Sequence, residues 1–212
     1  MTTDSEANLR ADARRNRGQI LLAAKRMFAE LGADVPMEEI ARAAGVGVGT
    51  LYRRFPDREA LIRAVARDNF ENVLIEARAA VAEEPTAWDA LVRFLRQSRE
   101  LQLSVQLAMV SPLARSVLED DPMTNEFRYA LVDELDGLVH QAQTDGALRD
   151  DIGTGDVAML FMLLVRQMPS QYEDASRMAP DRCMAIMLDG IRARPGSPLL
   201  PFRPLTRTDI GV

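Results

Sequence analysis

Three polar side chains of different chemistry, Thr50, Tyr52 and Arg53, lie close together directly after Val48 and Gly49. A hydroxyl, a phenol and a guanidinium can hydrogen-bond phosphate oxygens and the edges of DNA bases, and a glycine lets a backbone approach closely. We expect Thr50 and Tyr52 to bind phosphate and Arg53 to bind a base or a phosphate. Val48 can read a base only by apolar contact, for instance with a thymine methyl group.

Two short helices are predicted to position these residues. The apolar residues of 39–44 share one face at helical spacing, and Gly45 then ends the helix because glycine tolerates a positive φ. In the second helix, which reaches residue 55, Leu51 and Phe55 are four residues apart and can face inward. Two helices joined by a short glycine-containing turn form a helix-turn-helix. The alternative is an ordinary corner between helices with a polar exterior.

Arginines flank this pair of helices on both sides. Four of them lead into a first helix whose apolar stripe spans residues 20–31: Arg10, Arg14, Arg15 and Arg17. This cluster is either a DNA-contacting arm or a solvated tail, and residues up to about 13 are expected to be frayed. After the second short helix, Pro56 stops the helix and Asp57 can cap the next one. Arg58 and the backbone N–H groups at that helix start form a natural phosphate site.

Charge is distributed unevenly along the chain. The net charge is −6 over 212 residues, but residues 1–58 hold ten Lys/Arg against eight Asp/Glu, or +2, which leaves −8 for the remainder. A weakly positive head on an acidic body would turn the head toward a polyanion. No apolar run is long enough to span a membrane and the N-terminus lacks a signal-peptide pattern, so a cytoplasmic protein without membrane contact is expected. Cys183 is the only cysteine and is expected to pack as a small apolar side chain.

Only helices can be read in the rest of the chain, which predicts an all-α fold. A helix from Arg58 toward residue 81 is followed by segments near 88–109, 113–118, 127–146, 156–168 and 181–194. Beyond residue 194, prolines at every third position favour an extended tail, in which Leu199, Leu200 and Phe202 could dock on the body. The expected domains are residues 1–57 for DNA binding, 58–194 for the helical body and 195–212 for the tail.

Catalytic and metal-binding signals are weak. His140 is the only histidine, and although Asp136 lies one helical turn before it, further metal ligands cannot be identified. The acidic residues 119–121 and 150–151 look like solvated loop charges, which lack the burial that acid–base catalysis needs. We therefore predict no catalytic residues, no metal, no cofactor and no enzymatic activity.

The predicted helices at 156–168 and 181–194 are apolar around nearly their whole circumference. Such helices need cover on every side, and in a body of about six helices part of that cover must come from a second chain. The alternative is a monomer in which these two helices form the centre of the core. Because two-fold symmetric DNA binders read paired half-sites, we favour the dimer.

The stretch from Arg17 to Phe70 resembles the N-terminal domain of the TetR family of transcriptional regulators. The resemblance is carried by several motifs together: an apolar helix ending at Phe28 and Gly32, the AxxAGV turn, GTLYxxF, and a Pro-Asp entry into a long helix. It implies a three-helix DNA-binding domain followed by a helical domain for effector binding and dimerisation. In two places the chain departs from the usual family pattern. Gly47 stands where a capping serine is common, and Val48 stands where a long polar residue is frequent.

The resemblance and the residue chemistry together indicate three candidate sites. The DNA-binding set is Arg17, Met37, Gly47, Val48, Gly49, Thr50, Tyr52, Arg53 and Arg58. The implied pocket for a small, largely apolar effector is lined by Trp88, Leu95, Met109, Phe127, Leu131, His140, Phe161 and Met162. The implied interface of the homodimer is formed by Met159, Leu163, Met184, Met187, Leu188 and Ile191.

The sequence favours a homodimeric repressor that leaves operator DNA when a small molecule binds in the body. One alternative is a DNA-binding module with a dry core and no effector. Another is a helical enzyme, which would need a cluster of reactive side chains that the sequence does not offer.

Overall fold

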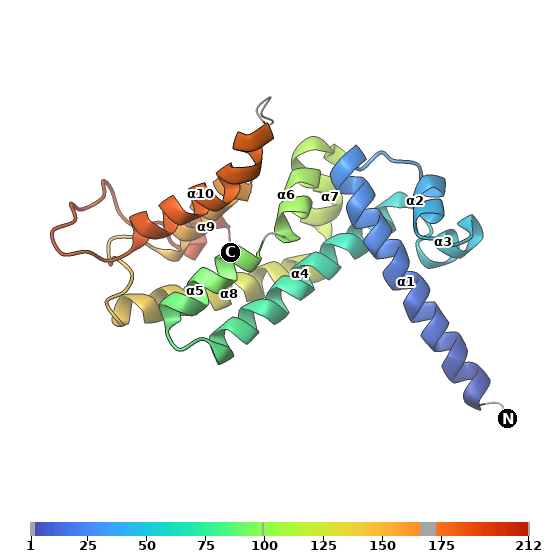
Figure 1. The fold of residues 1–212 in the computed structure, drawn as a ribbon, viewed down its shortest axis with the longest axis horizontal. Helices are drawn as coiled ribbons and strands as arrows, with labels where there is room; N and C mark the ends of the chain where they lie inside the picture. The colour runs from blue at the N-terminus through green and yellow to red at the C-terminus, as the bar shows by residue number, and fades with distance from the viewer. Residues whose placement is uncertain (1–2, 99, 166–172, 212) are drawn as a thin grey trace. The chain divides into compact units, whose positions relative to one another are not determined.

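A computed structural model describes residues 3–98, 100–165 and 173–211 of the chain (Figure 1). Over these residues the fold is built from helices, and the only β-type pairing is an isolated antiparallel bridge between Leu148 and Arg192. The all-α prediction is therefore confirmed. The elements in chain order are α1 (Thr3–Leu31), α2 (Met37–Ala43), α3 (Val48–Arg54), α4 (Arg58–Glu83), α5 (Ala87–Gln97), α6 (Glu100–Val110), α7 (Pro112–Asp120), α8 (Pro122–Thr144), α9 (Thr154–Val165), α10 (Glu173–Ile191) and the 3-10 helix η1 (Arg207–Ile210).

The chain forms two compact units. The first, called the head, comprises Met1–Asp68 and Gln106–Thr124, and the second, called the body, comprises Asn69–Val105 and Asn125–Val212. Helices α4, α6 and α8 each begin in one unit and end in the other. The predicted domain boundaries after residues 57 and 194 stay predictions.

The head has an apolar core to which each of its first four helices contributes. Since an α-helix turns every 3.6 residues, the stripe of α1 presents Ile20, Ala24 and Phe28 to one side, and all three are buried. Gly32 ends α1 in a left-handed conformation with φ of 85°. The remaining large, fully buried side chains of this core are Ile40 of α2, Leu51 of α3, and Leu61, Ile62 and Val65 of α4.

The start of α1 differs from the prediction. Residues up to about 13 were expected to be frayed, but the helix begins at Thr3, ahead of the apolar stripe. None of the described side chains between residues 12 and 19 is buried, so this part of the helix is not supported by the head core.

A buried carboxylate fastens α4 to the segment that contains α7. Asp121 accepts hydrogen bonds from the Thr124 backbone N–H (2.9 Å) and hydroxyl (2.6 Å), as the cap of α8. The Arg67 Nε also donates to it (2.8 Å), and Arg63 lies 3.6 Å away. The expectation that Asp121 is a solvated loop charge was wrong, because its side chain is only 2% exposed. The hydrogen bond from Arg67 holds the pKa of this carboxyl well below its usual range.

The body is organised around one apolar cluster. Its members come from α4, α5, α8, α9 and α10 and include Leu91, Leu95, Val139, Val157 and Leu188. The predicted long helix over 88–109 is two helices. Helix α5 ends at Gln97, and its C-cap Ser98 donates its hydroxyl to the Phe94 carbonyl (2.6 Å). Cys183 was expected to pack as an apolar side chain, but it is exposed on α10.

The C-terminal tail after α10 is fastened to the body mainly through its backbone. Leu205 donates its N–H to Asp156 (3.0 Å) and accepts a hydrogen bond at its carbonyl from the Gly155 N–H (2.9 Å). Nearer α10, the Leu200 N–H donates to Asp151 (2.7 Å). The apolar side chains that were expected to dock are instead turned to solvent: Leu199 is 82% exposed and Phe202 is 96% exposed. Asp151 is not a freely solvated charge either, since its side chain is 15% exposed and paired with an arginine.

Candidate nucleic-acid interface

Helices α2 and α3 form the predicted helix-turn-helix. Gly45 is left-handed with φ of 67°, and the N–H of Val46 reaches back to the Ala41 carbonyl (3.0 Å), which closes α2. Gly47 then starts α3 without a side-chain cap, and its carbonyl accepts the N–H groups of Thr50 (2.8 Å) and Leu51 (3.1 Å). The turn therefore reverses the chain within a few residues, as the sequence pattern predicted.

Helix α3 has one buried face and one exposed face. Leu51 and Phe55 are buried, whereas Val48, Tyr52 and Arg53 are exposed and Thr50 is half-buried. Two side-chain hydrogen bonds order the outer face: Arg53 donates to the Thr50 hydroxyl (3.1 Å), and the Tyr52 phenol donates to the Glu38 carboxylate (3.2 Å). Loss of hydration around the phenol and the hydrogen bond to Glu38 raise the pKa of Tyr52. A phenol is protonated at neutral pH without such a shift, so Tyr52 can donate.

Most of the predicted DNA-binding residues share this outer face. Gly47, Val48, Gly49, Thr50, Tyr52 and Arg53 lie on or directly before α3. Arg17 is exposed on α1, in the stretch that precedes the head core. Met37 is only 4% exposed, and its side chain belongs to the core. The guanidinium of Arg58 donates to the carbonyls of Ala33 and Val35 (2.5 Å each), so it holds the loop between α1 and α2.

Helix capping explains why α4 starts where it does. Asp57 accepts a hydrogen bond from the Ala60 N–H (2.7 Å), as predicted for its N-cap position. Arg58 sits in the first turn, where a phosphate site was predicted from its charge and the free N–H groups. Nothing in the sequence indicated that two carbonyls lie within its reach, because they belong to residues more than twenty positions earlier.

The predicted effector residues fall into two groups. Trp88, Leu95, Leu131 and Phe161 are buried in the body's apolar cluster, and Phe127 packs against it. Met109 belongs to the head, and the side chains of His140 and Met162 are exposed. His140 Nδ1 lies 2.9 Å from the Asp136 carbonyl oxygen, and the Asp136 carboxylate accepts the Thr154 hydroxyl (2.5 Å). Among the described residues, no group of three or more potential ligands is placed to hold a metal ion.

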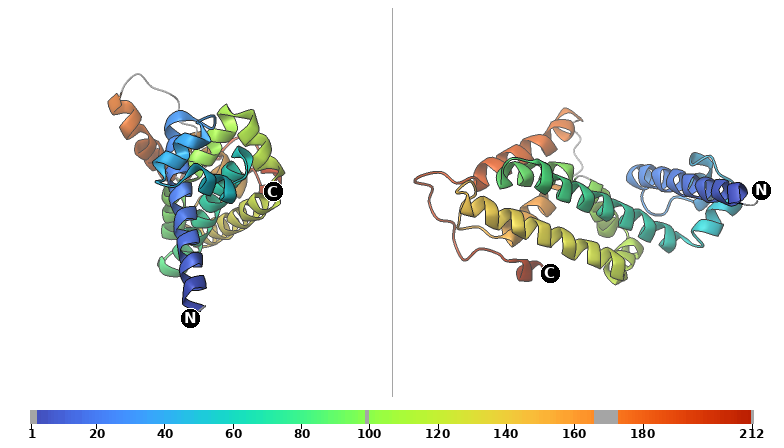
Figure 2. Two further views of the ribbon diagram at one scale, coloured as in Figure 1. Left: turned by 90° about the vertical axis from the view of Figure 1, so that its right-hand side faces the viewer. Right: turned by 90° about the horizontal axis from the view of Figure 1, so that it is seen from below.

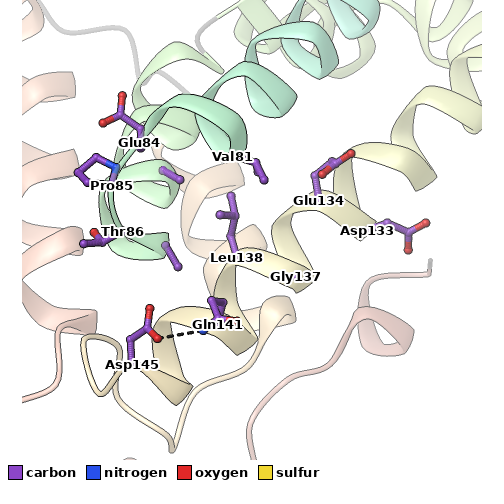
Figure 3. Close-up of a pocket in the computed structure, with 12 residues that line it drawn as sticks. Val81, Glu84, Pro85, Thr86, Asp133, Glu134, Gly137, Leu138, Gln141 and Asp145 are labelled. Carbon is purple, nitrogen blue, oxygen red and sulfur yellow. Dashed lines mark hydrogen bonds between the residues drawn. The ribbon is translucent and has the colours of Figure 1, made fainter.

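A hollow of about 520 Å³ opens on the body between the α4–α5 turn and α8 (Figure 3). None of the eight predicted effector residues lines it. Its four carboxylates already have partners: Glu84 accepts from Arg93 (3.1 Å), Glu134 from Arg78 (2.9 Å) and Asp145 from Gln141 (2.9 Å), and Asp133 pairs with Arg207 (2.6 Å). The hollow therefore offers no cluster of carboxylates awaiting a cation.

The predicted dimer residues also divide into two sets. Met159 and Leu163 of α9 are exposed, at 46% and 57%. The four residues on α10, Met184, Met187, Leu188 and Ile191, are each less than 10% exposed and face the body's own core. Other exposed large apolar side chains among the described residues of these helices are Leu160 and Met162 of α9 and Met178 and Ile186 of α10. The spacing of 184, 187, 188 and 191 marks one helical stripe, which could have indicated an internal face.

Residues 20–65 match the N-terminal domain of the tetR family of bacterial regulatory proteins. Residues 86–193 match the C-terminal domain of SbtR-like transcriptional regulators. The chain belongs to the TetR family. It is therefore a transcriptional regulator with a helix-turn-helix DNA-binding domain, and the resemblance seen in residues 17–70 is confirmed. The described part of the chain has no helix of sufficient length and apolarity for a membrane span.

Similar proteins match over most of their length. The uncharacterized HTH-type regulator Rv2250c of Mycobacterium tuberculosis is 30% identical, over 80% of this chain and 86% of its own. Among solved structures, the TetR regulator SCO0520 of Streptomyces coelicolor is 32% identical, with 84% and 98% of the two chains covered and a TM-score of 0.66. A TetR regulatory protein of Mycobacterium vanbaalenii is also 32% identical, with 87% and 99% covered and a TM-score of 0.61.

Proposed function

We propose that this TetR-family regulator is a homodimeric cytoplasmic repressor that is released from its operator by a small molecule. The observation that carries the DNA-binding part is the two-sided α3: Leu51 and Phe55 anchor it, and Thr50, Tyr52 and Arg53 point away from the core. Once placed in a major groove, an arginine can read a guanine edge, and a hydroxyl or phenol can hold a phosphate.

The outer face of α3 is partly prepared for this task. The bond between Arg53 and Thr50 limits the freedom of both side chains, so less conformational entropy is lost on binding. Tyr52 would have to exchange Glu38 for a phosphate oxygen, since one phenol proton serves only one acceptor at a time. The Glu38 carboxylate therefore competes with DNA for Tyr52, and this competition lowers affinity without changing which bases are read.

The DNA-binding proposal is tested with a duplex that the full-length chain selects from a random-sequence pool. Tyr52→Ala combined with Arg53→Ala should weaken binding by about 5- to 150-fold, because removing a good base-specific hydrogen-bond pair costs about 1–3 kcal/mol. The matched control is Arg96→Ala, which removes an exposed arginine from α5 in the body. If the double variant binds as tightly as the parent while the fold is unchanged, the proposed role of α3 is wrong.

The dimer proposal rests on the exposed apolar side chains of α9. Met159, Leu160, Met162 and Leu163 lie within five residues of sequence, and each is at least 39% exposed. Water contact with that much apolar surface is unfavourable, and a second chain would remove it. Leu163→Arg should shift the protein toward monomer in sedimentation, whereas Leu22→Arg, at an exposed leucine on α1, should not. Equal behaviour of the two variants would contradict the interface.

The effector proposal is supported by the apolar character of the body's core. A structure of FadR from Bacillus subtilis holds stearoyl-CoA, and a KstR2 of Mycobacterium tuberculosis is described as a ketosteroid regulator; both are similar to this chain in fold. A panel of acyl-CoAs, steroids and other largely apolar compounds should therefore contain one that raises the melting temperature and releases the selected duplex. If no member of such a panel does either, a regulator without an effector is the better description.

A further inference from the structure

The first part of α1 is a helix that extends past the packed head. From Thr3 to Ile20, the first buried residue among the side chains that the structure describes, the helix is roughly 25 Å long at 1.5 Å per residue. Figure 1 and the left view of Figure 2 show this N-terminal part projecting beyond α2 and α3. We call residues 3–19 the arm helix.

Two arginines of the arm helix continue the seam by which α1 packs on the head. Buried Leu21, Ala24 and Phe28 fall on one face of α1, and Arg14 and Arg17 precede them in the same alternating three- and four-residue spacing. At about 100° per residue, all five positions lie within a sector of about 80°. The two arginines therefore lie on the same side of α1 as the rest of the head, beyond the point where the apolar contacts stop.

The chemistry of this arginine face points to a polyanion. Both side chains are exposed, and at a spacing of three residues on one helix face their like charges repel each other. Arg15 is different, because it lies on another face and pairs with Asp12 of the same helix (3.5 Å). A row of phosphates would relieve the repulsion on the arginine face, and each guanidinium can bind a phosphate with two parallel hydrogen bonds.

We propose that the arm helix binds the DNA backbone outside the half-site read by α3, through Arg14 and Arg17. This inference rests on the proposed DNA-binding function, and it adds a second contact between the protein and the duplex to the one made by α3. Arg14 lies six residues before Ile20, or roughly 9 Å along the helix axis, which corresponds to roughly three base pairs of flanking duplex at 3.4 Å per base pair. Because phosphates carry no base identity, the arm raises affinity for flanked sites without changing the sequence that is preferred.

The test uses the full-length chain and the selected duplex in two lengths, one trimmed to the core site and one with eight further base pairs on each side. The parent protein should bind the longer duplex about tenfold more tightly. Arg14→Ala combined with Arg17→Ala should remove this difference, because the variant lacks both guanidiniums that bind the flanking phosphates. The salt dependence on the long duplex should also weaken by about 0.9 in log–log slope for each phosphate that the variant no longer neutralises.

Arg26→Ala is the matched control, since Arg26 is an exposed arginine on the opposite face of α1. Alanine favours helix, so circular dichroism should show that the arm variants keep their helical content. If the double variant keeps the advantage of the long duplex, or if Arg26→Ala abolishes it equally, the arm proposal is overturned. The affinity of the Tyr52→Ala and Arg53→Ala variant for the trimmed duplex tests the role of α3, and the gain in affinity with duplex length tests the arm. The two proposals can therefore fail separately.

Discussion

The two ends of the chain show that regular backbone and tertiary attachment are separate properties. The arm helix at the N-terminus is regular, yet none of its described side chains from residue 12 onward is buried. The C-terminal tail has no helix before η1, yet its backbone is hydrogen-bonded to the body at Leu200 and Leu205. One end owes its order to local hydrogen bonds, and the other owes it to interactions with distant residues.

Glycines affect both ends of the chain, but their effects on stability are opposite. In the tail's binding site, Gly153 and Gly155 leave room for the backbone of Leu205 and Thr206. In the arm, Gly18 stands in open space within a helix, where it only lowers helix stability. A Gly→Ala substitution at each place should therefore have opposite signs.

The largest effect is expected at the tail. In Gly155→Ala the new Cβ would lie 2.5 Å from the Thr206 carbonyl oxygen, and in Gly153→Ala it would overlap the Leu205 carbonyl oxygen. Either the tail leaves its site or the backbone shifts, and the free energy of unfolding should fall by about 1–3 kcal/mol, as for other overpacked sites. Urea denaturation of the full chain measures this change.

Gly137→Ala serves as the control for both tail variants, because Gly137 lies within α8 and an added Cβ would meet no atom within 4 Å apart from the nearby backbone of its own helix. This substitution should raise the free energy of unfolding slightly, by up to about 1 kcal/mol, through better helix propensity. Unchanged stability of Gly155→Ala and Gly153→Ala would mean that the tail does not depend on these close approaches.

A smaller effect is expected from acid. The hydrogen bond from Arg149, followed by that from the Leu200 N–H, lowers the pKa of Asp151 to about 2. Since the unfolded value is near 3.9, the contribution of this carboxylate to stability is complete above about pH 4 and is lost as the pH falls toward 2. Within the tail, Arg203 and then Thr206 also hold the pKa of Asp209 well below its usual range, so it acts with the same sign.

Asp151→Asn isolates the contribution of this carboxylate. The free energy of unfolding of the parent, compared between pH 6 and pH 3, should fall more than that of Asp151→Asn, because the amide cannot take up the proton. The helical content of the arm should not follow this difference, since Asp151 belongs to the body. An equal loss in both proteins would show that the Asp151 carboxylate makes no pH-dependent contribution to stability.

Local spacing was enough to predict the outer face of α3, since Leu51 and Phe55 are one helical turn apart and turn Tyr52 outward. The Asp57 cap followed from the same local logic, because its partner is only three residues away. Asp121 was missed since its burial depends on arginines more than fifty positions earlier in the chain. The tail was missed for the same reason: backbone hydrogen bonds to Asp151 and Asp156 leave no periodic pattern in the sequence.

The smallest effect is expected at Gly18. Gly18→Ala should favour the helix locally by about 0.5–1 kcal/mol, because alanine loses less backbone entropy than glycine on folding. Since the described side chains of residues 12–19 do not join the head core, this gain should appear as stronger helical ellipticity and slower amide exchange in the arm, with an unchanged urea midpoint. If the urea midpoint rises as well, the arm folds cooperatively with the head. The contrast with the tail would then be one of degree.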